Sequence, residues 1–314
     1  MRILSAIFFY LLSTQFIFAD WLRCHIALNN LYPEIKADPE YTRVREYTKK
    51  FISNQLAELP KAAQKRLLDS LENDTDIRND KILINAGAAG VTPRESLTKG
   101  LQAELTLYQK FMSHPAHGLF MAHELEHMKE MLKGNPHADL LRYAYTRLLT
   151  KDSILESEKL AARAEYKYIK GLYTHDDLQK MKAAFNPQEY SSLRTKALTI
   201  RRALRADPAK VFTFSKEDLA LYDAWLKLRL DFTLIKRLEK AFALNEDEYA
   251  TQLSTRYIYR LQNNDMNQIV QRAQRIVSTG AGILLAGSIV SYKTWMEDDD
   301  DEDPESNSPN TQGE

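Results

Sequence analysis

Two histidines, His123 and His127, stand four residues apart in the stretch "HELEH", and Glu124 directly follows the first of them. On an α-helix, residues four apart lie one turn apart on the same face, so both imidazoles can bind one metal ion. Glu124 would lie about 100° further round the helix, where it can reach a water molecule on that ion. The pattern predicts a Zn²⁺ ion held by both histidines, with Glu124 as the general base that activates the water.

The sequence around this motif predicts a helix that carries it near its middle. The helix is expected to begin near Gly118 and to end at "GNP", Gly134–Pro136, because glycine followed by proline is a common helix stop. Phe120 and Met131 fall on the same stripe as the histidines, and apolar residues on an adjoining face can anchor the helix to a core. The alternative is a surface helix whose histidines and glutamates face water.

A catalytic zinc ion needs a third protein ligand and leaves its fourth position to water. Cysteine is not expected to supply it, because Cys24 is the only cysteine in the chain. A third histidine at the HExxHxxGxxH spacing is also absent, since Glu130 and Lys133 occupy the positions of the glycine and the histidine. The third ligand is therefore expected to be a carboxylate on a later helix.

The stretch "LESEKLAARAEYKYI", within a helix predicted from Ser153 to Leu172, supplies such carboxylates. Glu158 is the first choice, because Ala161 beside it would let two helices approach closely. Glu165 lies two turns along the same face, and it is the alternative ligand or a carboxylate that orients a ligand histidine. Glu156 is a weaker third choice.

With these residues assigned, the segment 118–169 resembles the glutamate-type zincin (HExxH) metallopeptidases. These enzymes carry HExxH on one helix and a third ligand, a glutamate, on the next. The resemblance is specific at His123, Glu124 and His127. It implies a zincin-like helical core and hydrolysis of peptide bonds by a water molecule activated by Zn²⁺.

The second helix resembles the "ExxA" ligand helix of several membrane-associated and exported members, with Glu158 followed by Ala161. It departs from them at Ala162, where those families place an aspartate that orients a ligand histidine. Tyr173 and His175 follow this helix, where zincins often present a side chain that stabilises the oxyanion.

Apolar residues at helical spacing predict a mainly α fold, α+β at most, with one small sheet allowed. The best strand candidate is Lys81–Val91, which is short, apolar and bounded by glycines. "TPRE" from Thr92 to Glu95 has the pattern of a capping box, which predicts another helix up to Met112. Further helices are expected within Asp20–Leu71 with a break at Pro60, at Leu140–Leu149, Asp176–Phe185 and Pro187–Leu204, and from Ser215 to Leu244.

Residues 1–19 have the order of regions found in a secretory signal peptide. Arg2 is followed by an apolar run through Phe18, and Ala19 offers a cleavage site before the polar Asp20. The pattern predicts export to the periplasm, the cell envelope or the medium. An uncleaved anchor and a buried first helix of a cytosolic protein are the alternatives.

Residues 276–295 predict an apolar helix close to the minimum length for crossing a bilayer, roughly 17 residues. Arg272 and Arg275 before it, against Lys293 behind it, would place the body of the protein in the cytoplasm, in conflict with export. A glycine-rich helix packed on the core or on a partner is the alternative. Residues 296–314 are acidic and expected to be disordered.

The chain is thus expected to contain five segments. They are a signal peptide (1–19), a zincin-like catalytic domain (20–204), a helical C-terminal part packed on it (205–275), the apolar helix (276–295) and the acidic tail (296–314).

The charge composition of the chain bears on which class of partner it binds. Basic and acidic residues balance at 43 each, which indicates no nucleic-acid partner. The expectation is an exported zinc metallopeptidase that acts on a peptide or protein and can associate with a membrane through 276–295. The competitors are a non-catalytic helical envelope or membrane-associated protein, in which HELEH is incidental or only binds metal, and a zinc hydrolase of other substrates.

Overall fold

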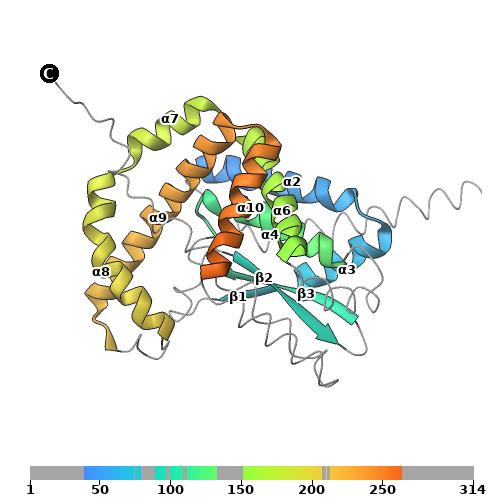
Figure 1. The fold of residues 1–314 in the computed structure, drawn as a ribbon, viewed down its shortest axis with the longest axis horizontal. Coiled ribbons are helices and arrows are strands. Elements are labelled where there is room, and N and C mark those ends of the chain that lie inside the picture. Colours follow the sequence, from blue (N-terminus) through green and yellow to red (C-terminus); the bar gives the residue numbers. More distant parts are fainter. Residues whose placement is uncertain are drawn as a thin grey trace, which may run out of the picture.

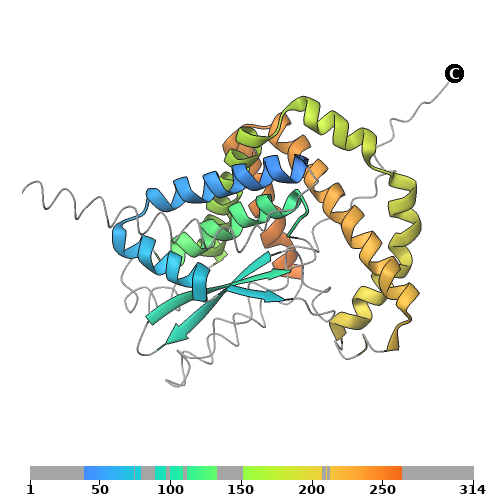
Figure 2. The same ribbon diagram turned by 180° about the vertical axis from the view of Figure 1, so that it is seen from behind.

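The computed structural model describes residues 39–73, 75–78, 89–96, 100–108, 112–132, 151–206, 210 and 213–263. Over these residues the fold is mainly α-helical with one small sheet, as the sequence predicted. Figures 1 and 2 show the sheet at one side of the molecule, with helices packed over it. The helices are α2 (Pro39–Ala57), α3 (Lys61–Asn73), α4 (Ala116–Leu132), α6 (Lys151–Leu172), α7 (His175–Ala184), α8 (Pro187–Ala206), α9 (Lys216–Ala243) and α10 (Glu246–Asn263).

Most predicted helix ends fall within a few residues of the observed ones, including the ends of the helix that carries HELEH. The start of α9 is confirmed in atomic detail. Ser215 Oγ accepts a hydrogen bond from the Asp218 amide at 3.0 Å, and the Asp218 carboxylate accepts one from the Ser215 amide, which completes a capping box.

The described part of the sheet has three strands in the order β1-β3-β2: β1 (Thr75–Arg78), β2 (Ala89–Ser96) and β3 (Gly100–Tyr108). Strands β1 and β3 are parallel, whereas β2 and β3 are antiparallel, with Ala89 opposite Leu107 and Ser96 opposite Gly100. Helices α3 and α4 pack against this sheet, so the sheet supports the helix that carries HELEH.

The helix predicted from Thr92 to Met112 is therefore wrong, because β2 and β3 occupy most of that segment. The sequence of β3, "GLQAELTLY", alternates apolar and polar residues with the period of two that suits a strand. That alternation prevails over the local capping pattern of "TPRE". Pro93 lies in β2, which forms an edge of the described sheet, the place where a strand tolerates proline.

Several predicted segments lie outside the described residues. Only the last three residues of the predicted strand Lys81–Val91 are described, and they belong to β2. The segments 1–19, 140–149, 276–295 and 296–314 are not described. Among the helices of the described ranges, none has the length and apolar character needed to cross a membrane.

Helices α2, α4 and α6 meet at Gly118. A Cβ atom on this glycine would lie 2.0 Å from the Tyr168 hydroxyl and 2.6 Å from Thr48 Oγ1. These two oxygens lie 2.7 Å apart in a buried hydrogen bond that joins α2 to α6. The absence of a side chain at Gly118 therefore allows α4 to approach α6 closely.

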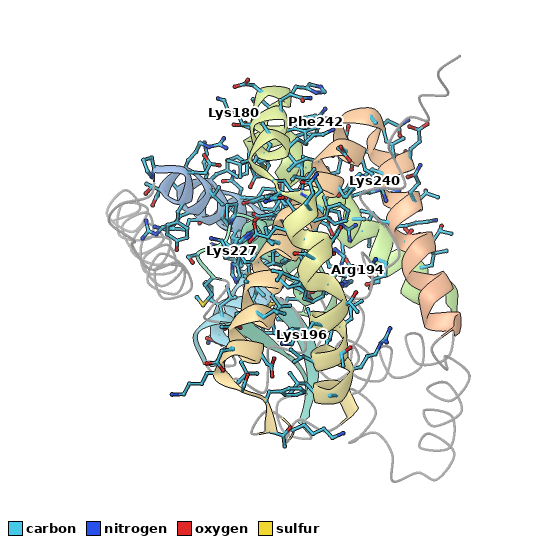
Figure 3. The ribbon with its side chains drawn as sticks, turned by 90° about the vertical axis from the view of Figure 1, so that its left-hand side faces the viewer. Lys180, Arg194, Lys196, Lys227, Lys240 and Phe242 are labelled. Atoms are coloured by element: carbon cyan, nitrogen blue, oxygen red, sulfur yellow. The ribbon has the colours of Figure 1, made fainter. Side chains whose placement is uncertain are left out.

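Helices α9 and α10 also pack against α6. Arg163 pairs with Asp247 at 3.1 Å, and the Tyr166 hydroxyl donates to the Leu244 carbonyl at 3.4 Å, so α10 runs alongside α6. Helices α7 and α8 lie along the outside of α9 (Figures 1 and 2). Lys196 on α8, labelled in Figure 3, pairs with Asp218 on α9 at 2.6 Å.

Gly118→Ala is expected to lower the free energy of unfolding by about 1–3 kcal/mol, because the new methyl group overlaps two fully buried oxygens that cannot move aside. The loss should occur although alanine gains about 1 kcal/mol of helix propensity over glycine. Urea unfolding followed by circular dichroism measures the change.

Gly171→Ala is the matched control. Its Cβ would also overlap a hydroxyl, that of Tyr47 at 1.9 Å, but this ring is only half-buried and its far end can shift. The control should cost much less than Gly118→Ala. An equal loss in the two variants would contradict the role given to the close contact at Gly118.

Candidate metal centre

Helices α4 and α6 bring His123, His127 and Glu158 together, as the sequence predicted. His123 Nε2 lies 3.3 Å from one carboxylate oxygen of Glu158, and His127 Nε2 lies 3.4 Å from the other. The two Nε2 atoms are 3.0 Å apart. One donor atom from each residue lies within 4.8 Å of the other two, and all three side chains are buried. This group could hold a metal ion.

Both histidines are oriented through their other ring nitrogen. His123 Nδ1 donates to Glu165 Oε1 at 2.7 Å, and His127 Nδ1 lies 3.1 Å from Ser157 Oγ. Each imidazole thus has Nδ1 engaged by a neighbour on α6 and turns Nε2 toward Glu158. Outer hydrogen bonds of this kind fix the tautomer and the ring direction of metal-binding histidines.

The structure separates the roles of the two carboxylates that the sequence left open. Glu158 faces the Nε2 atoms, on the side where an ion would bind, whereas Glu165 contacts His123 at Nδ1, on the opposite side of the ring. Glu156, the third choice, is exposed and does not belong to the group.

Glu165 is itself held by residues from the C-terminal helices. It is completely buried, and its second oxygen accepts a hydrogen bond of 3.0 Å from the hydroxyl of Tyr249 on α10. A guanidinium nitrogen of Arg237 on α9 lies 4.0 Å from the same oxygen. Sequence reasoning missed Ser157, Tyr249 and Arg237. Ser157 stands next to Glu158, but the other two are distant in sequence and have no motif around them.

The charges in this group are strongly coupled. Burial alone would lower the pKa of His123, but the hydrogen bonds and charges of Glu158 and Glu165 outweigh it and raise the pKa from 6.5 to about 9. Burial alone would raise the pKa of Glu158, but His127 and His123 hold it well below its ordinary value. The surroundings of the His123 ring therefore favour a positive charge, which a proton or a metal ion can provide.

Glu124 follows His123 in the middle of α4 and is 3 % exposed. Its place one residue further round the helix is the one that the HExxH pattern requires of a general base. A buried carboxylate beside a metal centre can serve in proton transfer, and its assignment as the base remains a prediction.

Tyr173 and His175 do not lie near the metal centre. They follow the end of α6 at Leu172, which is fourteen residues from Glu158, or about 21 Å at the helical rise of ~1.5 Å per residue. His175 instead lies against Phe242, labelled in Figure 3, with 4.4 Å between ring centroids. Neither residue belongs to the group formed by His123, His127 and Glu158.

Comparisons of the chain with protein-family models, with curated proteins and with solved structures found no match. The assignment of a function therefore depends on the site itself.

Replacing Glu158 with glutamine is expected to weaken metal binding at least about 100-fold, because loss of a ligand should exceed the 10–100-fold cost of losing an outer hydrogen-bond partner. Glu156→Gln is the matched control on the same helix, and its exposed side chain predicts unchanged affinity. Competition with a chromophoric chelator measures both constants. Equal losses, or no loss in the Glu158 variant, would contradict the ligand set.

Stability should depend on pH in opposite directions with and without metal. The pKa of His123 is about 9 in the folded chain, against an ordinary value of 6.5. Its contribution to metal-free stability is full below pH 6.5 and is lost as the pH rises to 9. A bound metal requires neutral imidazoles, so the metal-induced rise in Tm should grow over the same range.

Thermal unfolding at pH 6, 7, 8 and 9, in chelator and in excess Zn²⁺, measures this dependence. His123→Ala serves as the control, because it removes both the titrating group and the ligand. A metal-induced rise in Tm that shrinks toward pH 9 would contradict the assignment.

Proposed function

We propose that the protein is a zinc-dependent metallopeptidase in which His123, His127 and Glu158 hold the ion and Glu124 is the general base. The observation that carries this proposal is the convergence of two imidazole nitrogens and one carboxylate beside a buried glutamate at the HExxH position. Two histidines and a glutamate are a ligand set of catalytic zinc in peptidases, and they leave one position for water.

The spacing of the donors supports zinc. A tetrahedral ion at about 2.0–2.2 Å from each ligand atom keeps those atoms roughly 3.3–3.6 Å apart. The observed separations are 3.0 Å between the two nitrogens and 3.3 and 3.4 Å from the nitrogens to the carboxylate oxygens. The 3.3 and 3.4 Å distances run to the two different oxygens of Glu158, and one donor atom from each residue lies within 4.8 Å of the other two, a spacing compatible with one shared ion.

When bound, zinc supplies a water molecule of lowered pKa and polarises the carbonyl group of the substrate. Glu124 accepts a proton from the water as its oxygen bonds to the carbonyl carbon. It then gives that proton to the leaving amine as the carbon–nitrogen bond breaks. Glu165 and Ser157 keep the two imidazole rings aligned throughout.

The resemblance to glutamate-type zincins contributes to this proposal. The sequence departs from those families at Ala162, where they carry an orienting aspartate. In this chain Glu165 lies against His123 at 2.7 Å and performs the task that the resemblance assigns to that aspartate. We take a peptide or protein as the substrate on this resemblance, and export on the signal-peptide pattern of residues 1–19.

One observation favours a second function, a metal site without turnover. His123, His127, Glu124 and Glu158 are each less than 9 % exposed, and structural zinc sites are closed to solvent whereas catalytic sites keep an open position. In that case the ion would stabilise the packing of α4 on α6.

Glu124→Gln distinguishes the two functions. It should keep bound zinc but lower the rate of peptide cleavage by about 10²–10⁴-fold, the usual contribution of a general base. A mixture of quenched fluorescent peptides of varied sequence measures cleavage, and elemental analysis measures zinc.

Glu126→Gln is the control, because Glu126 lies on the same helix and pairs with Lys129 at 2.7 Å. It should leave both quantities unchanged. Full zinc content with no cleavage by the wild type would support the structural site instead.

A further inference from the structure

The outer carboxylate of the metal centre, Glu165, contacts three helices. It lies on α6, its Oε1 atom accepts from His123 on α4, and its Oε2 atom accepts from Tyr249 on α10. Arg237 on α9 approaches the same Oε2 atom at 4.0 Å. Glu165 and Tyr249 are each 0 % exposed, and Arg237 is 6 % exposed. The orientation of the carboxylate is therefore determined by protein groups.

Two contacts between α10 and α6 help to hold Tyr249 in position. Its ring packs on that of Tyr166 with 5.6 Å between centroids, and Asp247 two residues before it pairs with Arg163. The start of α10 is therefore attached to α6 on the turn of the helix that carries Glu165. The phenol is fully buried where its hydroxyl donates to the carboxylate.

The contacts that hold Glu165 also affect the orientation of His123. A buried carboxylate with a single partner can rotate about its terminal torsion, and its distance to His123 Nδ1 then varies. A second donor on the other oxygen removes that freedom, and a nearby guanidinium offsets part of the cost of burying the charge. With Glu165 held in this way, His123 keeps its proton on Nδ1 and presents Nε2 to a metal ion.

We propose that Tyr249 and Arg237 are positioning residues of the metal centre, which hold Glu165 against His123 and make α9 and α10 part of the site. This inference rests on the proposed metal site. It implies that residues near the C-terminal end of the described chain control metal affinity, although they lie far from HELEH in sequence.

Tyr249→Phe in the full-length protein tests the inference, because it removes one hydroxyl and keeps the ring. It is expected to weaken zinc binding roughly three- to tenfold, below the ~10–100-fold typical of a group in direct contact with a ligand. The readout is the dissociation constant measured with a competing chelator. A second readout is the visible absorption spectrum of the cobalt form, which reports on ligand geometry.

Tyr168→Phe is the matched control. It also deletes a buried hydroxyl from the helical core, one that bonds to Thr48 at 2.7 Å, but that bond does not involve the metal centre. Both variants should lose thermal stability, whereas only Tyr249→Phe should change zinc affinity and the cobalt spectrum. A purely structural role for Tyr249 predicts that the two variants behave alike.

Two further variants test whether the residues act through Glu165. In a Glu165→Gln background, Tyr249→Phe should have little additional effect on affinity, since the two residues form one chain of contacts. Arg237→Met should weaken zinc binding and Arg237→Lys should restore part of it, which keeps the test open if Tyr249→Phe is too unstable to purify.

The outcomes separate this inference from the proposed function. Zinc binding by the wild type with equal affinity in Tyr249→Phe and Tyr168→Phe would overturn the inference and leave the metal site intact. No zinc binding by the wild type would overturn the metal site and the inference with it.

Discussion

The arrangement depends on one constraint, the burial of two carboxylates on either side of His123. Glu158 and Glu165 lie on the same helix and approach opposite nitrogens of one imidazole ring. Buried carboxylates are costly unless a positive charge and hydrogen bonds compensate them. The hydrogen bonds and charges of both carboxylates outweigh burial and raise the pKa of His123 to about 9, which favours a positively charged ring in the metal-free chain. A metal ion between the Nε2 atoms would take over the same role.

The close packing of α4 on α6 brings the two carboxylates within reach of His123. Gly118 on α4 lets the helix lie against Tyr168 and Thr48, and Ala161 and Ala162 on α6 are fully or almost fully buried. Small residues at these positions allow a close approach, so that a glutamate on α6 can reach two histidines on α4. The sheet supports α4 from beneath, while α9 and α10 enclose Glu165. The group that could hold a metal ion therefore depends on helices from α4 to α10.

Sequence predicted the part of the site that depends on local geometry. The four-residue spacing placed His123 and His127 on one face, and the small residue beside Glu158 indicated the second helix. Sequence favoured Glu158 as the ligand but left Glu165 open as an alternative ligand or an orienting carboxylate, because both lie on one face and their roles depend on how α6 is rotated against α4. It also missed β2 and β3, where pairing between strands prevailed over a local helix signal, and Tyr249, whose contact with Glu165 spans 84 residues of sequence.

We propose that the imidazoles of His123 and His127 and the carboxylate of Glu158 bind a single zinc ion. X-ray absorption at the zinc edge, on the full-length protein loaded with one equivalent of zinc, tests it most directly. The expected result is a shell of about four nitrogen and oxygen atoms at roughly 2.0–2.2 Å, with outer scattering from two imidazole rings. Six oxygen atoms without imidazole scattering, or no retained zinc, would contradict it.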